Sequence, residues 1–280
     1  MKRHGLVGEL LAEFFGTAIL ILFGVGVVAQ VVTQGDNDFG DHNAIALGWG
    51  VGVTLGVYVA ARTSGAHLNP AVSIALAIFR GFAWAKVAPY VVAQFLGAFV
   101  AALLVRWNYS EAIAAIDPEH TILTQGIFST LPGNGALPIT TMEAFRDQVI
   151  GTAILVFVIF ALTDLKNTAP EANLTPLIIG LLVVGLGIAW GSVAGYAINP
   201  ARDFGPRVAE LITGYQGAMR DQNGSLYFWV PIVAPVIGAV IGGALYTYCI
   251  ERFLPPTDEP DPDPDPDDSL EPHSQENAHA

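Results

Sequence analysis

Long apolar stretches separated by short polar segments make up most of the 280-residue chain. A helix needs roughly 20 apolar residues to cross about 30 Å of hydrocarbon. Six stretches meet this length, at residues 6–33, 44–62, 86–107, 142–163, 174–193 and 228–251. The first is longer than the apolar region of a signal peptide, so it predicts a span that the protein retains. The pattern therefore predicts an all-α membrane protein with six transmembrane helices.

Two further apolar stretches, residues 69–79 and 199–212, are too short to cross a bilayer. Both begin with Asn-Pro, and asparagine is a favoured N-cap while proline is favoured at the first helical position. Arg80-Gly81 is a suitable end for the first, with a cation and a glycine cap, and Gly214 for the second. Half-length helices occur at membrane depth only inside protein or beside a watery cavity. Each stretch therefore predicts a re-entrant half-helix.

The chain contains an internal duplication. The sequence GTAIL begins at Gly16 and again at Gly151, and NPA begins at Asn69 and again at Asn199. The expected repeats, about 6–107 and 142–252 with a linker at 108–141, each hold three spans and one half-helix. An odd number of spans inverts the second copy, and inverted repeats with broken helices form a site near the membrane midplane. One transmembrane domain over residues 1–254 is expected.

The two NPA triplets are the strongest candidates for function. They comprise Asn69, Pro70 and Ala71 in the first repeat and Asn199, Pro200 and Ala201 in the second. Inversion brings the two half-helix N-termini together, and each carries roughly half a positive charge. If backbone N–H groups hold each asparagine oxygen, the side-chain NH₂ groups are left to donate into a cavity. This arrangement predicts a passage for neutral solutes that repels cations, although the triplets could instead serve only as helix caps.

Composition and charge narrow the class of protein. Hydrophobic residues make up 52% of the chain and charged residues 13%, with a mean hydropathy of +0.51, which argues against a soluble enzyme. The net charge of −13 argues against nucleic-acid binding. Residues 255–280 combine many acidic residues and prolines with no Lys or Arg, so a disordered acidic tail is expected. The single cysteine, Cys249, excludes an intrachain disulfide and a metal site built on thiolates.

The loop after the first span indicates the orientation of the chain. It contains Asp36, Asp38 and Asp41 but no Lys or Arg, whereas the N-terminus begins with Lys2 and Arg3. Positively charged loops remain on the cytoplasmic side. Both termini are therefore expected in the cytoplasm.

Two NPA boxes in inverted three-span repeats resemble the aquaporin (major intrinsic protein) family over roughly residues 6–252. The resemblance implies a passive channel in the cell membrane and not an enzyme, with neither a cofactor nor a metal, in contact with membrane lipid. It also implies a homotetramer with one pore in each protomer. In this family the residue that matches Glu13 supports a re-entrant loop, and Gln148 takes the equivalent place in the second repeat.

The family's outer constriction carries over to this chain by spacing from the NPA boxes. Its four positions are Trp49, Gly187, Tyr196 and Arg202. Trp49 and Gly187 match the glycerol-facilitator pattern, and Asp203 is typical of that branch, although it would also support the helix dipole. We expect Gly187 to widen the throat, Trp49 and Tyr196 to form aromatic walls, and Arg202 to donate to hydroxyl groups. Pore-lining carbonyls that accept from solute hydroxyls are expected at Gly65, Ala66, His67, Gly195, Tyr196 and Ala197.

Several residues depart from that branch. Tyr196 stands where facilitators usually have Phe, so its hydroxyl would narrow the throat or contact the solute; Leu131 and Ile232 also differ from the usual residues. The leading hypothesis is a channel for glycerol and similar small neutral polyols that also passes water. The alternatives are a channel mainly for water, limited by Tyr196, and a coupled secondary transporter or adhesion-type membrane protein. Mercury-sensitive water channels carry Cys where this chain has Tyr196, so little block by mercurials is expected.

Overall fold

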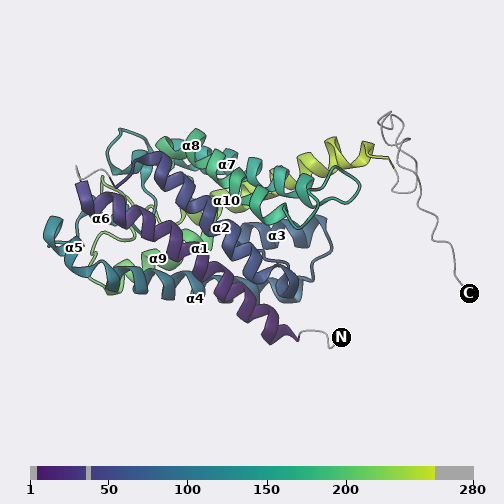
Figure 1. Cartoon of the computed structure of the whole chain (residues 1–280). Helices are drawn as coiled ribbons and strands as arrows, with labels where there is room; N and C mark the ends of the chain where they lie inside the picture. Colours follow the sequence, from purple (N-terminus) through teal and green to yellow (C-terminus); the bar gives the residue numbers. More distant parts are fainter. Residues whose placement is uncertain (1–4, 36–38, 256–280) are drawn as a thin grey trace, which may run out of the picture.

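A computed structural model describes residues 5–35 and 39–255, and these residues form an α-helical bundle (Figure 1). Six of the helices are long and apolar enough to cross a membrane, as the sequence predicts. They are α1 (Leu6–Gln34), α2 (His42–Ser64), α4 (Trp84–Asn108), α7 (Thr141–Thr163), α8 (Thr175–Ala194) and α10 (Val230–Cys249). The shorter elements are α3 (Pro70–Phe79), α5 (Ser110–Ile116), α6 (Ile122–Gln125), α9 (Pro200–Ile212) and the 3-10 turns at Pro132–Gly135 and Glu251–Phe253. The described residues contain no β-strand, only one isolated bridge between Arg220 and Leu226.

Helices of the two predicted repeats interlock. Within each repeat the first span packs on the last, α1 on α4 and α7 on α10. Between the repeats, α2 packs on α8, α9 on α4, and α3 on α10. Each half-helix therefore contacts the last span of the opposite repeat, which places the starts of both half-helices inside the bundle.

Glycines permit the close approach of the spans at matching places in the two repeats. A Cβ atom added at Gly97 of α4 would overlap the carbonyl oxygen of Phe14 in α1. A Cβ atom added at Gly238 of α10 would likewise overlap the carbonyl oxygen of Val149, the residue of α7 that corresponds to Phe14. Small residues at such crossings let helix backbones pack closely in a membrane.

The ends of the two half-helices lie where the sequence predicts them. Arg80 caps α3 and is followed by Gly81 with φ of +70°, and Thr213 caps α9 and is followed by Gly214 with φ of +111°. Glycine adopts this left-handed backbone without the steric cost of a side chain. Each chain reversal after a half-helix therefore uses the residue best suited to it.

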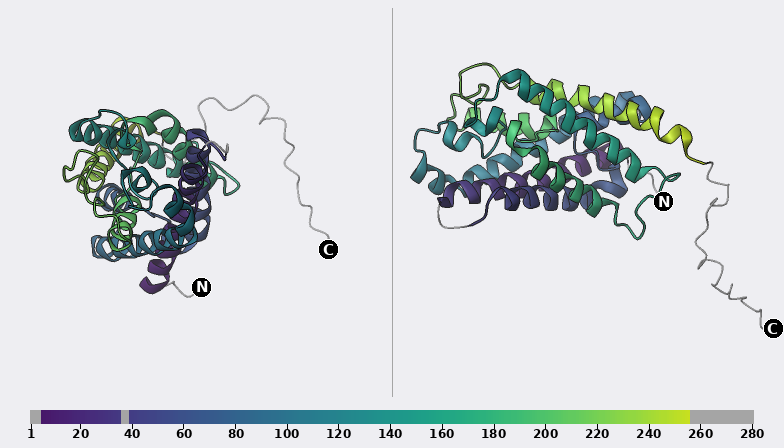
Figure 2. Two further views of the ribbon diagram at one scale, coloured as in Figure 1. Left: turned by 90° about the vertical axis from the view of Figure 1, so that its left-hand side faces the viewer. Right: turned by 90° about the horizontal axis from the view of Figure 1, so that it is seen from above.

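The chain enters and leaves the bundle at one end, here called the terminal side (Figures 1 and 2). The opposite end, where α1 ends and α2 begins, is the far side. Asp41 lies there as the N-cap of α2 and accepts hydrogen bonds from the backbone N–H groups of Asn43 and Ala44. These bonds hold the pKa of the exposed Asp41 carboxyl below its usual range. The predicted acidic tail, from Pro256 onward, lies outside the described residues, as do Lys2, Arg3, Asp36 and Asp38.

Candidate functional site

Asn69 and Asn199 are the N-caps of the two half-helices. The side-chain oxygen of Asn69 accepts a hydrogen bond from the backbone N–H of Ala71 at 2.9 Å, and that of Asn199 accepts from Ala201 at 3.0 Å. Pro70 and Pro200 occupy the first helical positions. The NPA triplets thus start α3 and α9 in the way that their residue types predict.

The two asparagines also join the repeats to each other. The side-chain nitrogen of Asn69 donates to the carbonyl oxygen of Ile198 at 2.8 Å, and that of Asn199 donates to Leu68 at 2.8 Å. The sequence predicts that both NH₂ groups donate only into the cavity, and these two hydrogen bonds correct that prediction. Each NH₂ carries two hydrogens, and one is used in this exchange. One hydrogen on each asparagine remains for a solute.

The backbone before each asparagine repeats one irregular conformation. Gly65, Ala66 and Leu68 have positive φ angles, and so do Gly195, Tyr196 and Ile198 in the second repeat. Left-handed backbone costs roughly 1–2 kcal/mol at a residue with a side chain. Its recurrence at matching positions shows that the surrounding contacts enforce it.

Glu13 supplies those contacts in the first repeat. One carboxylate oxygen accepts from the backbone N–H of His67 at 2.9 Å and the other from Leu68 at 2.8 Å. The same carboxylate accepts from Ser64 Oγ at 2.6 Å and from Gln94 Nε2 at 2.7 Å. Glu13 is fully buried, and every one of these bonds goes to the re-entrant loop or its neighbours.

Gln148 takes the matching place in the second repeat. Its side-chain oxygen accepts from the backbone N–H of Ile198 at 2.8 Å, and its nitrogen donates to the carbonyl oxygen of Ala194 at 3.0 Å. Both side chains therefore lie where the sequence places loop supports.

The His67 side chain packs into the first re-entrant loop. Its Nδ1 lies 3.0 Å from Ser73 Oγ, and its ring centroid lies 4.5 Å from that of Phe82 and 5.0 Å from that of Tyr90. The ring is 9% exposed. These contacts hold the loop, while His67 also lines the cavity described next.

A cavity of about 970 Å³ runs from the terminal side toward the far side between the two repeats. Its terminal end is lined by Tyr58, Arg62 and Asn173, and its inner end by Trp49, Tyr196 and Arg202. The apolar part of the lining consists of Leu20, Val53, Val57, Val72, Leu76, Leu155, Ile159, Ile179 and Val183. The polar part consists of the re-entrant backbone and the two asparagines, at Gly65, Ala66, His67, Asn69, Ala197 and Asn199. Among the residues expected to contribute carbonyls, only Gly195 is absent from this lining.

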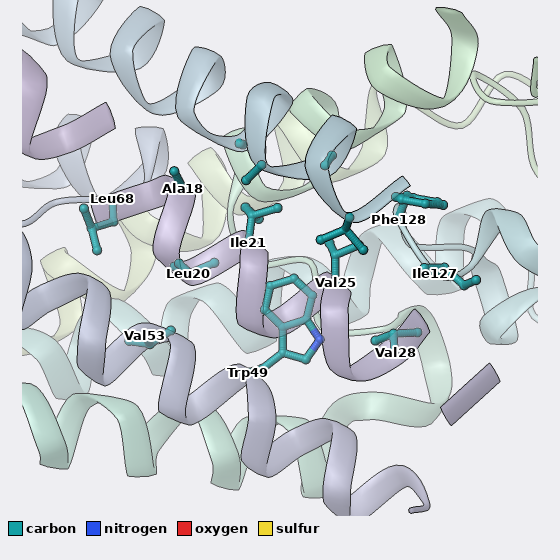
Figure 3. Close-up of a cluster of buried hydrophobic side chains, with 14 of the residues drawn as sticks. Ala18, Leu20, Ile21, Val25, Val28, Trp49, Val53, Leu68, Ile127 and Phe128 are labelled. Carbon is teal, nitrogen blue, oxygen red and sulfur yellow. The ribbon is translucent and has the colours of Figure 1, made fainter. Parts of the chain in front are cut away.

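Trp49 and Arg202 are in direct contact at the inner end of the cavity. The guanidinium carbon of Arg202 lies 4.0 Å from the centroid of the Trp49 ring. Figure 3 shows the indole against α1, near Ile21 and Val25, and a Cβ atom added at Gly24 would overlap it. Both residues line the cavity. A desolvated guanidinium is stabilised on an aromatic face, and at this separation no solute can lie between the guanidinium and the indole.

The ring of Tyr196 occupies the room that Gly187 leaves. A Cβ atom added at Gly187 would lie 3.0 Å from Tyr196 Cζ and 3.2 Å from its hydroxyl oxygen. That oxygen is buried and has no hydrogen-bond partner within the described part of the chain. Two expectations are therefore corrected: Gly187 accommodates the Tyr196 ring rather than opening free space, and the hydroxyl lies in the wall rather than in the throat.

A buried ion pair lies in the first two turns of α9. Asp203 Oδ1 accepts from Arg207 Nε at 2.6 Å, and Asp203 Oδ2 accepts from the backbone N–H and the hydroxyl of Thr130. Arg207 also donates to the carbonyl oxygens of Ala218, at 2.6 Å, and Thr130. Both members of the pair are fully buried. Asp203 thus anchors the loop that contains Thr130, in addition to its place in the first turn of the helix.

Sequence analysis missed Arg207 and Glu210 as parts of this region. Glu210 is 1% exposed and accepts from Ser129 Oγ at 2.8 Å. The detectable signal was the spacing of Asp203, Arg207 and Glu210, which places acids and a base on one side of a helix within an otherwise apolar chain.

The far-side loop is stabilised by a second carboxylate, that of Asp117. It accepts hydrogen bonds from the backbone N–H of Thr121 at 2.8 Å and from the Thr124 hydroxyl at 2.7 Å. Burial raises the pKa of Asp117, but these hydrogen bonds outweigh burial and hold the pKa below its usual range. The loop between α4 and α7 is thus held by an ionised acid.

Known proteins share this arrangement. The sequence pattern of the major intrinsic protein family matches residues 1–246. The glycerol uptake facilitator protein of Pseudomonas aeruginosa is 44% identical over 265 residues, covering 91% of this chain and 93% of its own length. Probable aquaglyceroporin-2 of Gibberella zeae is 44% identical over 256 residues, covering 89% of this chain and 74% of its own. The X-ray structure of the aquaglyceroporin from Plasmodium falciparum superposes with a TM-score of 0.80 at 35% identity, covering 89% of this chain and 99% of that one.

The chain belongs to the major intrinsic protein family. It is a multi-pass membrane protein with the aquaporin fold, and its class is that of passive channels for water and small solutes rather than enzymes.

Proposed function

We propose that the chain is a channel for glycerol and similar small neutral polyols that also passes water and excludes protons and ions. The observation that carries this proposal is the mixed lining of the cavity, which combines many apolar side chains with the Asn69 and Asn199 amides and the irregular backbone. A polyol is mixed in the same way, because its CH groups lie along one edge and its hydroxyls along the other. The name of the Pseudomonas aeruginosa relative supports the same solute.

In this proposal the re-entrant loops replace the hydration shell of the solute. The carbonyls at Gly65, Ala66 and His67, and at Tyr196 and Ala197, accept from its hydroxyls. The remaining amide hydrogens of Asn69 and Asn199 donate to it. Trp49 and Tyr196 contact its CH edge, and Arg202 donates to it after leaving the indole. Two half-helix N-termini at one point repel cations.

A channel that passes mainly water is the second candidate. The contact between Arg202 and Trp49 favours it, because that contact narrows the inner end of the cavity. A larger solute must displace the guanidinium, whereas water can pass through a smaller opening.

We also propose a homotetramer, both termini in the cytoplasm, a location in the cell membrane, and a single channel domain over residues 1–254. The identity of the family supports the assembly and the location, and the distribution of Lys and Arg supports the orientation. The acidic tail, residues 255–280, would then solvate the cytoplasmic face.

Swelling of proteoliposomes in gradients of glycerol, urea and a non-permeant sugar tests the proposal. Glycerol swelling well above that of protein-free vesicles, with no dependence on sodium or protons, is expected. Fast water flux with glycerol swelling at the protein-free rate would instead indicate the water channel. Flux that requires a sodium or proton gradient would indicate a coupled transporter.

A further inference from the structure

On the far side of the bundle, His42 contacts the helix that contains Gly187. It is the first residue of α2, a place fixed by the Asp41 cap. Its Nε2 lies 2.8 Å from the carbonyl oxygen of Gly187. A carbonyl oxygen only accepts hydrogen bonds, so Nε2 must carry the hydrogen.

The rings of His42 and Tyr196 pack against two glycines of α8, Gly191 and Gly187. A Cβ atom added at Gly191 would lie 2.5 Å from His42 Nε2, so the imidazole occupies the space above that glycine. One helical turn earlier, the ring of Tyr196 occupies the space above Gly187. The centroids of the two rings are 6.4 Å apart with their planes at 89°. The His42 ring therefore packs beside the Tyr196 ring, on its far side, against the same face of α8.

The Gly191 turn of α8 is held from a second direction as well. Asn134 Nδ2 donates to the carbonyl oxygen of Gly191 at 3.0 Å. His42 and Asn134 thus bind two carbonyl oxygens one turn apart, from two different elements. Removal of His42 would leave the Gly187 carbonyl without its side-chain donor while the Gly191 carbonyl keeps its own.

We propose that His42 is a positioning residue that determines the size of solute admitted by the constriction. Its hydrogen bond to Gly187 and its contact with Gly191 fix the α8 surface on which Tyr196 rests, and the Tyr196 ring forms one wall of the passage. The inference rests on the proposed polyol channel. It places selectivity partly in a residue outside the four constriction positions.

Three variants, His42→Ala, His42→Gln and His42→Asn, distinguish the loss of the hydrogen bond to Gly187 from a general loss of structure. In His42→Ala the Tyr196 ring gains room to move away from the cavity. The permeability to a five-carbon polyol, relative to that of glycerol, should therefore rise roughly two- to tenfold. This range corresponds to the free energy of one lost hydrogen bond. His42→Gln places an amide nitrogen near the position of Nε2 and should retain the wild-type ratio. His42→Asn is too short to reach Gly187 and should behave as His42→Ala.

Gly191→Ala tests the same contact from the other side. Its methyl group displaces the imidazole, so it should raise the polyol ratio in the wild-type chain. In the His42→Ala background the same change should add little, because the ring that it displaces is gone. Such non-additivity is the signature of two changes that act through one contact.

Water and polyol permeabilities are measured on the same proteoliposomes. Unchanged water flux with a raised polyol ratio in His42→Ala, His42→Asn and Gly191→Ala, and rescue by His42→Gln, is the expected result. The inference would be overturned if glycerol flux persisted and the ratio of five-carbon polyol to glycerol permeability equalled that of the wild type in every variant. It would also be overturned if His42→Ala, His42→Asn and Gly191→Ala all lost water and glycerol flux together. Absence of glycerol flux in the wild type would overturn the proposed function instead.

Discussion

The two re-entrant halves share a backbone design but differ in the chemistry that holds it. Both begin at Asn-Pro, and each asparagine donates to the loop of the other half. In the first half, Glu13 accepts hydrogen bonds from two backbone N–H groups. In the second, Gln148 accepts one such bond and donates another. One duplicated backbone is thus held by an acid in one copy and by an amide in the other.

The half-helices differ more strongly than their supports. The residues of α3 are apolar except for Ser73, whereas α9 buries Arg202, Asp203, Arg207 and Glu210. The half-helix α3 itself contains only neutral side chains, whereas α9 contains buried charges, among them Arg202 at the inner end of the cavity. The backbone symmetry of the repeats therefore does not extend to their buried charges. In the proposed channel, this difference would place more of the selectivity in the second half.

The largest effect is expected from Asp203→Leu. The change leaves Arg207 fully buried without its acidic partner, and breaking a buried pair in this way costs about 3–5 kcal/mol. We expect a marked loss of thermal stability in detergent. Size-exclusion chromatography with fluorescence detection, after heating, measures this loss.

Ser73→Ala is the matched change on the first half-helix. It removes a neutral hydroxyl that bonds to His67, Gln94 and Asn69 and should cost only about 1 kcal/mol. Equal losses of stability in the two variants would show that the two half-helices are held alike.

Exchanging the acid Glu13 and the amide Gln148 tests whether each re-entrant loop requires its own supporting residue. Glu13→Gln replaces one acceptor oxygen with an NH₂ group that faces N–H or O–H donors, at a cost of roughly 1–3 kcal/mol. Gln148→Glu should cost less, because a protonated carboxyl can still donate to Ala194 and accept from Ile198. Melting temperatures of the two variants check this order, and a greater loss in Gln148→Glu would reverse it.

The sequence predicted the fold closely because long apolar runs, caps and the duplicated NPA triplets are local signals. The supporting roles of Glu13 and Gln148 came from the resemblance to the family, and that of Asp203 from the same resemblance and from its position in the first turn of a helix. Arg207 and Glu210 were missed because their roles depend on loop residues such as Thr130 and Ser129, which approach only in three dimensions. The contacts of Tyr196 with Gly187 and of Arg202 with Trp49 likewise depend on packing between elements.

Gly187→His tests the constriction itself. The new side chain would start 3.0 Å from Tyr196 Cζ and must push that ring or enter the throat. Overpacking of this kind costs about 1–3 kcal/mol, so glycerol flux should fall about tenfold and water flux much less. An equal loss of both fluxes, measured by stopped-flow light scattering, would contradict the assignment of this region as the size filter.

The smallest effect is expected from mercurial reagents. Cys249 is exposed at the end of α10 and does not line the cavity. Water flux through wild-type protein should therefore change little when a mercurial is added, with Cys249→Ser as the control. Strong block of the wild type that Cys249→Ser removes would place a reactive thiol on the passage.

Uptake of labelled glycerol without an osmotic gradient tests the central claim most directly. Proteoliposomes and protein-free vesicles of the same lipid and size are compared while an imposed proton gradient is monitored. A passive glycerol channel that excludes protons should give glycerol entry well above the protein-free rate, with the proton gradient preserved. Glycerol entry at the protein-free rate, from a preparation that still conducts water, would contradict it.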